Sequence, residues 1–488
     1  MKRRDFIKTS AVLAAAAPLI RPVRALAEAS GEEVNDVHAQ LNKTIVHDIA
    51  RPQNSAGLME QIAAAQKAGR SVSVCGARHA MGGQQFGTRG TLVDMTGMNK
   101  VFRVDIDART VEIEAGIMWP QLIKWLHENA PELCVIQKQT GADDLTLGGA
   151  LASNIHGRSL TKKPLIEDIV SFTLIKADGT RVTCSRTENA DLFTLAIGGY
   201  GLFGIIDTIK LQLGTRFKVR RTVDVITTDK LIEAVEGRVK DGYLYGDFQY
   251  MTDEKSDGFM RQGIFSCYAP VPDDTALSAS SHDLGLEAWK GLYRLAHLDK
   301  QKAFQVYRDH YLATNGQIYW SDSHQTGIYL KDFNREFARE QNITAGSSLM
   351  LSEVYVPRDK FHELMESSRA AALATGMNII YGTVRFIKKD TESFMPWAKE
   401  DYACVIFNLY VIHTPEAIEK AKRDFQALYD IAINLGGRYY LTYHRWARKN
   451  QVEKAYPELK ELLALKLKHD PQELFQSDWY RHYKAMLG

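Results

Sequence analysis

The spacing of hydrophobic residues in the first half of the chain predicts alternating helices and strands from about residue 48 to 215. Residues 55–69 place apolar side chains every three or four positions between a Ser55 cap and a closing glycine, which predicts a helix. A short apolar strand is predicted at 72–75, and residues 101–116 alternate apolar and polar positions around a central turn, which predicts a hairpin. This layout is typical of an α/β cofactor-binding region.

The pattern changes beyond about residue 216. The segments "SLMLSEVYVP" and "ACVIFNLYVI" read as long alternating strands. A helix is predicted from the Thr414 cap and Pro415 to the pair Gly436-Gly437. Strands joined by helices without strict βαβ order predict an α+β domain with an antiparallel sheet.

The first 27 residues read as a transport signal. Arg3 and Arg4 precede an apolar run that is too short to span a bilayer, and Ala25-Leu26-Ala27 offers a cleavage site. This pattern predicts a twin-arginine signal peptide, export by the twin-arginine machinery and a periplasmic location. The alternative is a cytoplasmic protein with a basic amphipathic start.

Charge and cysteine content argue against two kinds of ligand, nucleic acids and metal ions. The signal segment holds six basic residues and one acidic residue, so its removal takes the formal net charge from +2 to −3, which argues against a nucleic-acid partner. The chain has 488 residues, too many for one core. Five cysteines lie far apart with no CxxC pair, so we expect buried, inert thiols and no zinc or other metal site.

Two glycine-rich segments are candidates for phosphate binding. The stretch "VSVCGARHAMGGQQF", residues 72–86, runs from a strand into a loop whose glycines let the backbone approach a phosphate, with Arg78 and His79 inside it. The stretch "TGADDLTLGGALASNIHGRSL", residues 140–160, adds small and hydroxyl residues that can line a diphosphate.

A third segment resembles a nicotinamide-dinucleotide fingerprint but fails on context. Gly199, Gly201 and Gly204 match GxGxxG, and Asp224 follows about twenty residues later. The segment before this motif reads as a helix and the segment after it reads as a strand. The nicotinamide motif requires the reverse order, so we reject a Rossmann NAD site.

In order along the chain, these three segments resemble the FAD-binding domain of the vanillyl-alcohol oxidase superfamily, the PCMH-type flavoproteins. The resemblance implies a two-subdomain FAD-binding domain at 48–215 and a substrate domain at 216–488 whose C-terminal segment returns to the first domain. It also implies that the following residues contact FAD: Gly76, Ala77, Arg78, His79, Ala80, Thr140, Gly141, Gly148, Gly149, Ser153, Asn154, His156, Gly157, Gly204 and Ile205.

Two branches of this superfamily differ in how they hold the flavin. "GARHAMGG" is similar to the loop of aldonolactone and alditol oxidases, in which the residue at the position of His79 bonds covalently to the flavin 8α-carbon. "NIHGRSL" and "DPQELFQSDW" instead resemble the decaprenylphosphoryl-ribose oxidase branch, whose FAD is not covalently bound. The alternative for His79 is therefore a histidine that only hydrogen-bonds in a phosphate loop.

The resemblance implies an FAD-dependent oxidoreductase that passes a hydride from an alcohol or sugar-like hydroxyl carbon to flavin N5, with oxygen or another acceptor reoxidising the flavin. We expect Arg385 near the reacting carbon, Tyr443 and His444 as proton acceptor and ring partner, and Arg448 for charge stabilisation. Alternation along a strand predicts that only one of Tyr443 and His444 lines the site. The structural alternatives are a surface ion pair for each arginine and a packed Tyr-His pair.

The substrate cannot be transferred from either branch, because "GGRYYLTYHRWARK" puts Tyr443 near the position of one branch's active-site lysine and only loosely resembles the other branch's "HWAK". A sugar-lipid oxidase with dissociable FAD and a flavin electron-transfer protein both stay open as alternatives.

Overall fold

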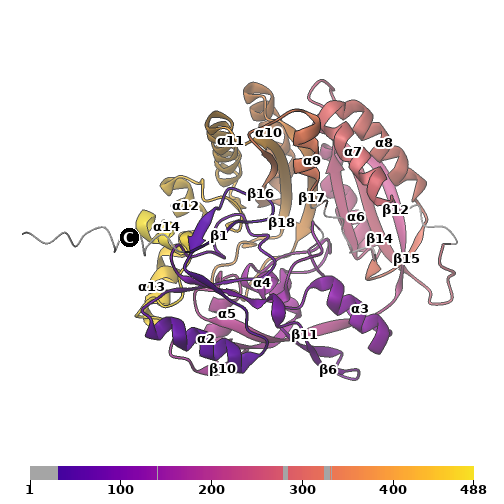
Figure 1. Ribbon diagram of the computed structural model, residues 1–488. Coiled ribbons are helices and arrows are strands. Elements are labelled where there is room, and N and C mark those ends of the chain that lie inside the picture. Colours follow the sequence, from indigo (N-terminus) through magenta and orange to yellow (C-terminus); the bar gives the residue numbers. More distant parts are fainter. Residues whose placement is uncertain (1–30, 140, 279–283, 324–329, 331) are drawn as a thin grey trace, which may run out of the picture.

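The computed structural model describes residues 31–139, 141–278, 284–323, 330 and 332–488. The predicted signal peptide and Thr140 lie outside the described residues. The chain combines helices with mainly antiparallel sheets, which confirms the predicted α+β class (Figure 1).

The amino-terminal part contains two sheets that enclose most of the predicted FAD contacts. A three-stranded parallel sheet has the order β3-β5-β4, and a six-stranded antiparallel sheet has the order β10-β9-β11-β7-β6 with β8 paired to β11. The strands are β3 (Asp48–Ala50), β4 (Val72–Cys75), β5 (Thr91–Asp94), β6 (Val101–Asp105), β7 (Thr110–Glu114), β8 (Leu133–Val135), β9 (Ile169–Ile175), β10 (Arg181–Ser185) and β11 (Ile205–Thr215). The helices are α2 (Ser55–Lys67), α3 (Trp119–Asn129), α4 (Leu147–Ala152) and α5 (Ala190–Ala196).

The second part is built on an eight-stranded antiparallel sheet with the order β15-β12-β14-β13-β17-β18-β16-β19. Its strands are β12 (Lys218–Thr227), β13 (Tyr245–Tyr250), β14 (Gln262–Val271), β15 (Ile318–Trp320), β16 (Ser347–Pro357), β17 (Ile379–Ile387), β18 (Tyr402–Ile412) and β19 (Arg438–Tyr439). Its helices are α6 (Thr228–Lys240), α7 (Leu286–Leu298), α8 (Lys300–Ala313), α9 (Phe333–Glu340), α10 (Phe361–Thr375) and α11 (Pro415–Asn434).

The two faces of this large sheet differ in chemistry. One face carries apolar side chains such as Phe248, Val384 and Val405, and it packs against α6, α10 and α11. Because side chains alternate along a strand, the neighbouring positions on β13, β17 and β16 point to the opposite face, and these include Asp247, Arg385 and Glu353. Burying charged side chains on a sheet face is costly unless they are paired or hydrogen-bonded.

The chain returns to the amino-terminal part after the large sheet. Helices α12 (Lys449–Ala455), α13 (Leu459–His469) and α14 (Asp478–Leu487) follow, and Figure 1 shows the yellow α14 beside the indigo β1 (Glu32–Val34), which pairs with β2 (Thr44–Val46). The backbone N–H of Val72 on β4 donates to Leu474 at 2.7 Å, and the N–H of Gln476 donates back to Val72 at 2.9 Å. The C-terminal segment therefore extends the parallel sheet that carries the glycine loop.

Most element predictions are confirmed. The predicted strand at 72–75, the hairpin at 101–116 and the helix capped by Thr414 are all present. The GxGxxG motif lies between a helix, α5, and a strand, β11, which confirms the rejection of a nicotinamide motif. The Ser55 cap is wrong, because the Asn54 side chain caps α2 and the Ser55 hydroxyl donates to Asp207 at 2.9 Å.

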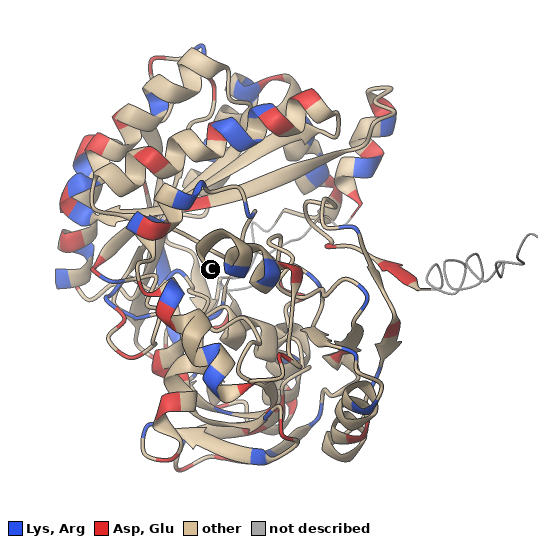
Figure 2. Cartoon of the chain, turned by 90° about the vertical axis from the view of Figure 1, so that its left-hand side faces the viewer, with Lys and Arg blue, Asp and Glu red and all other residues tan. Residues whose placement is uncertain are grey.

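The cysteines are buried, as the sequence predicted. All five cysteines are buried and unpaired, and burial raises the pKa of Cys75 to about 12 and that of Cys134 to about 11. Figure 2 shows basic and acidic residues mixed over the helices. Within the described part of the chain, no helix combines the length and apolarity needed to cross a membrane.

Candidate FAD-binding and active site

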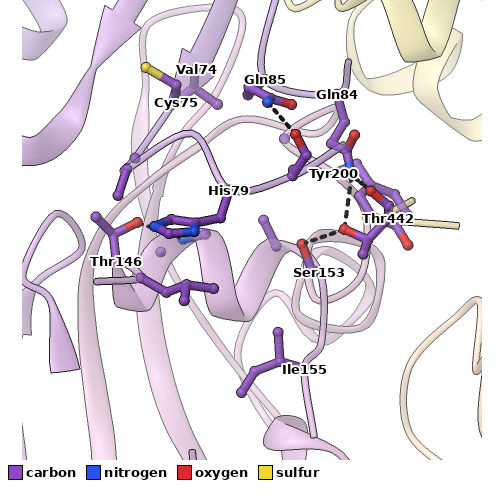
Figure 3. Close-up of a pocket in the computed structure, with 18 of the residues that line it drawn as sticks. Val74, Cys75, His79, Gln84, Gln85, Thr146, Ser153, Ile155, Tyr200 and Thr442 are labelled. Atoms are coloured by element: carbon purple, nitrogen blue, oxygen red, sulfur yellow. Dashed lines mark hydrogen bonds between the residues drawn. The ribbon is translucent and has the colours of Figure 1, made fainter. Parts of the chain in front are cut away.

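A cavity of about 210 Å³ lies in the amino-terminal part, and we call it the cofactor cavity (Figure 3). Its walls come from the loop after β4, from α4 and from the turn before β11, with Tyr440, Thr442 and Tyr443 closing it from the C-terminal side. The predicted FAD contacts that line it are Gly76, Ala77, Arg78, His79, Ala80, Gly141, Gly148, Gly149, Ser153, Gly204 and Ile205.

The loop after β4 is shaped to present its backbone. Arg78 has a left-handed φ of 64°, and its guanidinium pairs with Asp94 at 3.2 Å, so the side chain is engaged with β5. A Cβ on Gly76 would lie 2.0 Å from the hydroxyl oxygen of Thr146, so only glycine permits the close approach to α4. The N–H groups of Ala77, Arg78 and Ala80 donate to no described protein acceptor. Clustered free N–H groups form an anion-binding concavity.

His79 lies at the wall of the cofactor cavity and contacts a second histidine. Its Nδ1 is 2.8 Å from Nε2 of His38, and the two rings meet edge to face with centroids 4.8 Å apart. Burial lowers the pKa of His79 to about 4 and, together with the neighbouring His79, lowers that of His38 to about 3. Both rings are therefore neutral near pH 7, and a neutral imidazole is the nucleophilic form.

Two glutamines farther along the same loop add polar side chains to the cofactor cavity. Gln84 donates to the carbonyl and hydroxyl of Thr442 at 2.9 Å, and Gln85 donates to the carbonyl of Ala80 at 2.5 Å (Figure 3). The Oε1 atoms of both glutamines are buried without a partner. No acidic side chain is among the described residues that line the cavity. Unpaired N–H donors, buried acceptors and the absence of carboxylates fit a ligand that combines a diphosphate with a ring carrying N–H groups.

Three predicted FAD contacts lie outside the cofactor cavity. Asn154 is fully buried and its amide bonds Asp390 and the N–H of Ile166. Gly157 packs against the Lys138 carbonyl, 2.8 Å from where its Cβ would lie. His156 lies beyond the cofactor cavity, at the wall of a neighbouring one.

Two predicted catalytic residues are also placed elsewhere. His444 is buried and packs against the rings of both Phe425 and Trp446, and Arg448 pairs with Asp430 on the surface. Strand β19 ends at Tyr439 and the chain turns at 441–442, so Tyr443 and His444 lie in a loop; Tyr443 lines the site while His444 enters the core.

A second cavity of about 160 Å³ adjoins the first, and we call it the central cavity. Gln139, Ile155, Tyr440 and Tyr443 line both, and the polar face of the large sheet forms the far wall. Glu353 of β16, which is 98% buried here, was not among the site residues predicted from the sequence. The only signal was a lone acidic residue inside an otherwise apolar strand pattern.

Glu353 connects two other side chains of the central cavity. Its Oε1 lies 2.6 Å from Nε2 of His156, and its Oε2 accepts from the Tyr443 hydroxyl at 3.3 Å. The other ring nitrogen of His156 faces the Gly157 carbonyl at 3.1 Å, so that nitrogen carries a proton. Burial and the nearby Glu353 carboxylate raise the pKa of Tyr443 well above its usual value, so the phenol stays protonated.

His156, Glu353 and Cys404 are close enough to be considered as metal ligands. Their donor atoms lie within 4.8 Å of one another. However, His156 and Glu353 use the relevant atoms in a direct hydrogen bond, and burial raises the pKa of the Cys404 thiol well above its usual value. The cluster therefore has the properties of a hydrogen-bonded pair beside a protonated thiol.

Arg385 of β17 supplies a positive charge to the central cavity. It is 93% buried, its Nε has no hydrogen-bond partner, and it forms no ion pair with a described residue. Its neighbour on the same sheet face, Thr383, also has a buried hydroxyl without a partner. Buried polar groups are almost always paired, so these two atoms are candidates for hydrogen bonds to a ligand in the central cavity.

The cofactor cavity and the fold around it define a flavoprotein domain: residues 47–185 match the family described as "FAD binding domain". Over most of its length the chain is similar to L-gulonolactone oxidase from Mus musculus, at 24% identity over 443 residues that cover 88% of this chain and 93% of the relative. It is similar to L-gulono-1,4-lactone dehydrogenase from Mycobacterium tuberculosis, at 24% identity over 89% of this chain and 95% of the relative. Cytokinin dehydrogenase 2 from Arabidopsis thaliana is 31% identical over 31% of this chain and 30% of the relative. The chain thus carries an FAD-binding domain and resembles oxidoreductases beyond it.

Proposed function

We propose that this protein is an FAD-dependent oxidoreductase that oxidises a CH–OH group of a sugar-like or lactone substrate. The observation that carries the proposal is the junction of two cavities. An FAD-binding domain opens, at Tyr440 and Tyr443, into a chamber that holds a carboxylate, a phenol and an unpaired guanidinium. The two relatives that match over most of their length are named as enzymes of gulonolactone, which supports a substrate of this class.

The loop after β4 would hold the FAD diphosphate, and His79 would hold the ring through a bond from a ring nitrogen to the flavin 8α-carbon. This bond would displace one hydrogen from each partner; the flavin ring would take up both with their two electrons, and oxygen or another acceptor would then reoxidise it. The neutral state of His79 and its contact with His38 support this attachment, since they favour a nucleophilic nitrogen and fix the ring plane. When bound, FAD supplies the hydride acceptor.

The side chains of the central cavity supply the remaining requirements. The Tyr443 hydroxyl can accept a hydrogen bond from a substrate hydroxyl while it donates to Glu353, which gives the departing proton a route to a carboxylate. His156 fixes the Glu353 carboxylate from the other side. Arg385 places a positive charge where an alkoxide-like oxygen develops.

Two measurements test the proposal. Anaerobic bleaching of the absorbance near 450 nm is expected with some member of a panel of polyols, lactones and sugar acids. A yellow protein that no substrate bleaches would favour a flavin electron-transfer protein. A colourless protein from riboflavin-rich cells would contradict flavin binding itself.

The covalent bond has its own test. After acid precipitation, flavin is expected to stay with the wild-type chain and with His47→Ala, whose histidine is exposed, but to be released from His79→Ala. Release from the wild type would instead show dissociable FAD, as in the sugar-lipid oxidase alternative.

We also propose that the protein acts in the periplasm after twin-arginine export. Arg3 and Arg4, followed by the short apolar run, support this location. Cell fractionation of an Arg3→Lys/Arg4→Lys double variant tests it, since retention in the cytoplasm is expected for the variant and an unchanged distribution would contradict the proposal.

A further inference from the structure

A third cavity, of about 590 Å³, extends the central cavity under helices α7 and α8, and we call it the outer cavity. Tyr293, Tyr381 and Arg385 line both cavities, so the two adjoin. In Figure 1, α7 and α8 lie together beside the large sheet, where α8 contacts β12 and β14 and α7 contacts β17, and residues of both helices line the cavity. Nothing in the proposed chemistry of the central cavity requires a space of this size.

The outer cavity contains more buried positive charge than negative charge. Arg158, Arg221 and Arg385 line it, and Asp247 is the one carboxylate among the described lining residues. Arg158 and Asp247 form an ion pair at 3.8 Å, a distance too long for a hydrogen bond. Arg221 donates to Ser266 at 2.8 Å and lies 4.1 Å over the Tyr311 ring, so its described partners are neutral.

Several polar atoms in the outer cavity have no partner. They are Nε of Arg158, Nε of Arg385, Oδ1 of Asp247 and Oε1 of Gln249. Asp247, Gln249 and Arg385 are each more than nine-tenths buried. The pairing of Phe248 with Val384 sets these side chains next to one another on adjacent strands. These three side chains therefore form one continuous polar surface in the cavity.

Three buried guanidinium groups that share one carboxylate are unfavourable, and arginine cannot relieve the cost by losing its proton. The usual solution is an oxyanion, since the guanidinium fork matches a carboxylate or phosphate with two parallel hydrogen bonds. Carboxylate and amide oxygens without partners, such as those of Asp247 and Gln249, accept from hydroxyl groups.

We propose that the outer cavity is a subsite for an oxyanion, a carboxylate or a phosphate monoester, on a polyhydroxylated substrate whose reacting carbon lies in the central cavity. Arg158 holds the oxyanion, and Asp247 and Gln249 bind hydroxyls between the two ends. The inference rests on the proposed oxidoreductase function and makes the substrate an anionic sugar derivative. The lactones in the names of the relatives are neutral, so this chain differs from them in substrate charge.

The first test compares substrates in the flavin-bleaching assay. The panel pairs a sugar acid and a sugar phosphate with the polyol and lactone of the same carbon number, and we expect the anions to have the lower KM. In Arg158→Met, the KM for the anionic substrates should rise at least about 30-fold with little change in kcat, because a charge-assisted contact to the bound ground state is lost. Arg158→Lys should give an intermediate KM, since it keeps the charge but not the fork.

Arg220→Met is the matched control, because Arg220 lies next to Arg221 on β12 but is exposed and its loss changes the net charge equally. Equal KM values for neutral and anionic substrates, or equal effects of Arg158→Met and Arg220→Met, would overturn the subsite while leaving the oxidoreductase function intact. Preference for the acid over the phosphate, or the reverse, identifies the oxyanion.

The second test does not depend on turnover. Trp289 lines the outer cavity, so titration with inorganic phosphate should change the tryptophan emission saturably. The change should disappear in Arg158→Met and in Trp289→Phe. If no substrate bleaches the flavin but phosphate gives a saturable signal, the proposed oxidoreductase function is refuted and the subsite is not. If the folded wild type gives no phosphate signal, the subsite is refuted.

Discussion

Replacing Asn154 with alanine tests whether this residue joins the two halves of the protein or contacts the cofactor. Asn154 follows α4 with a left-handed φ of 46°, and the N–H of the next residue, Ile155, bonds Ala150, which completes a Schellman motif. Its side chain donates to Asp390 at 3.0 Å and accepts from the N–H of Ile166 at 3.1 Å. Asp390 belongs to the second half of the chain, so the side chain spans both.

The expected cost of Asn154→Ala is about 4 kcal/mol of unfolding free energy. The buried Ile166 N–H loses its partner, and the Asp390 carboxylate loses one of its hydrogen bonds while it keeps those from Glu392 and Ser393, at about 1–3 kcal/mol each. The left-handed backbone adds about 1 kcal/mol for alanine. Asn189 is the matched control, because it has the same φ of 46° but is exposed and makes one side-chain bond, to Thr183. Asn189→Ala should cost about 1 kcal/mol, so the difference isolates the buried network.

Urea unfolding followed by far-UV circular dichroism and by flavin absorbance measures both variants. We expect Asn154→Ala to shift the midpoint far more than Asn189→Ala while the folded variant keeps its flavin. The reasoning is wrong if the two variants unfold alike, and loss of flavin from a fully stable Asn154→Ala would show that Asn154 contacts the cofactor as the sequence resemblance implied.

Three further predictions concern buried ionisable groups. Burial lowers the pKa of His444 to about 3, so the unfolded chain binds the extra proton below about pH 6.5 and stability falls as the pH drops towards 3. His444→Phe should remove up to about 1.4 kcal/mol per pH unit of this loss, measured by urea unfolding at several pH values, and an unchanged acid slope would contradict it. Lys466→Met should cost about 3–5 kcal/mol because it leaves the buried Asp470 carboxylate without its ion pair, whereas the neighbouring exposed Lys468→Met should have little effect. Glu353→Gln should lower the rate of flavin reduction at least about 100-fold with flavin still bound, and a wild-type rate would remove Glu353 from the proton route.

Local patterns were sufficient for the elements and for the loop that faces the cofactor. Hydrophobic period and capping residues predicted the strand at 72–75, the hairpin that follows and the long helix α11, because these depend on neighbours in sequence. The glycine loop could be recognised because its glycines stand directly after a predicted strand, although the contact that requires Gly76, with Thr146, is distant in sequence.

The active-site residues depend on sheet register, which the sequence alone does not give. Glu353 and Tyr443 are 90 residues apart and meet only because β16 and the C-terminal loop are brought together. His444 and Arg448 belong to polar patterns as plausible as that of Tyr443, yet one enters an aromatic stack and the other a surface ion pair. The polar face of the large sheet emerges only when strands distant in sequence are aligned.

The docking of the C-terminal segment on β4 has a consequence for how the protein matures. The N–H of Thr88 bonds Asp478, which is 390 residues later in the chain, and Thr442 bonds Met81 of the glycine loop. During synthesis the edge of the parallel sheet at β4 therefore stays uncovered until the C-terminal residues have left the ribosome. Flavin loading is consequently a step that follows translation, and chains released early would lack a finished binding wall rather than only a tail.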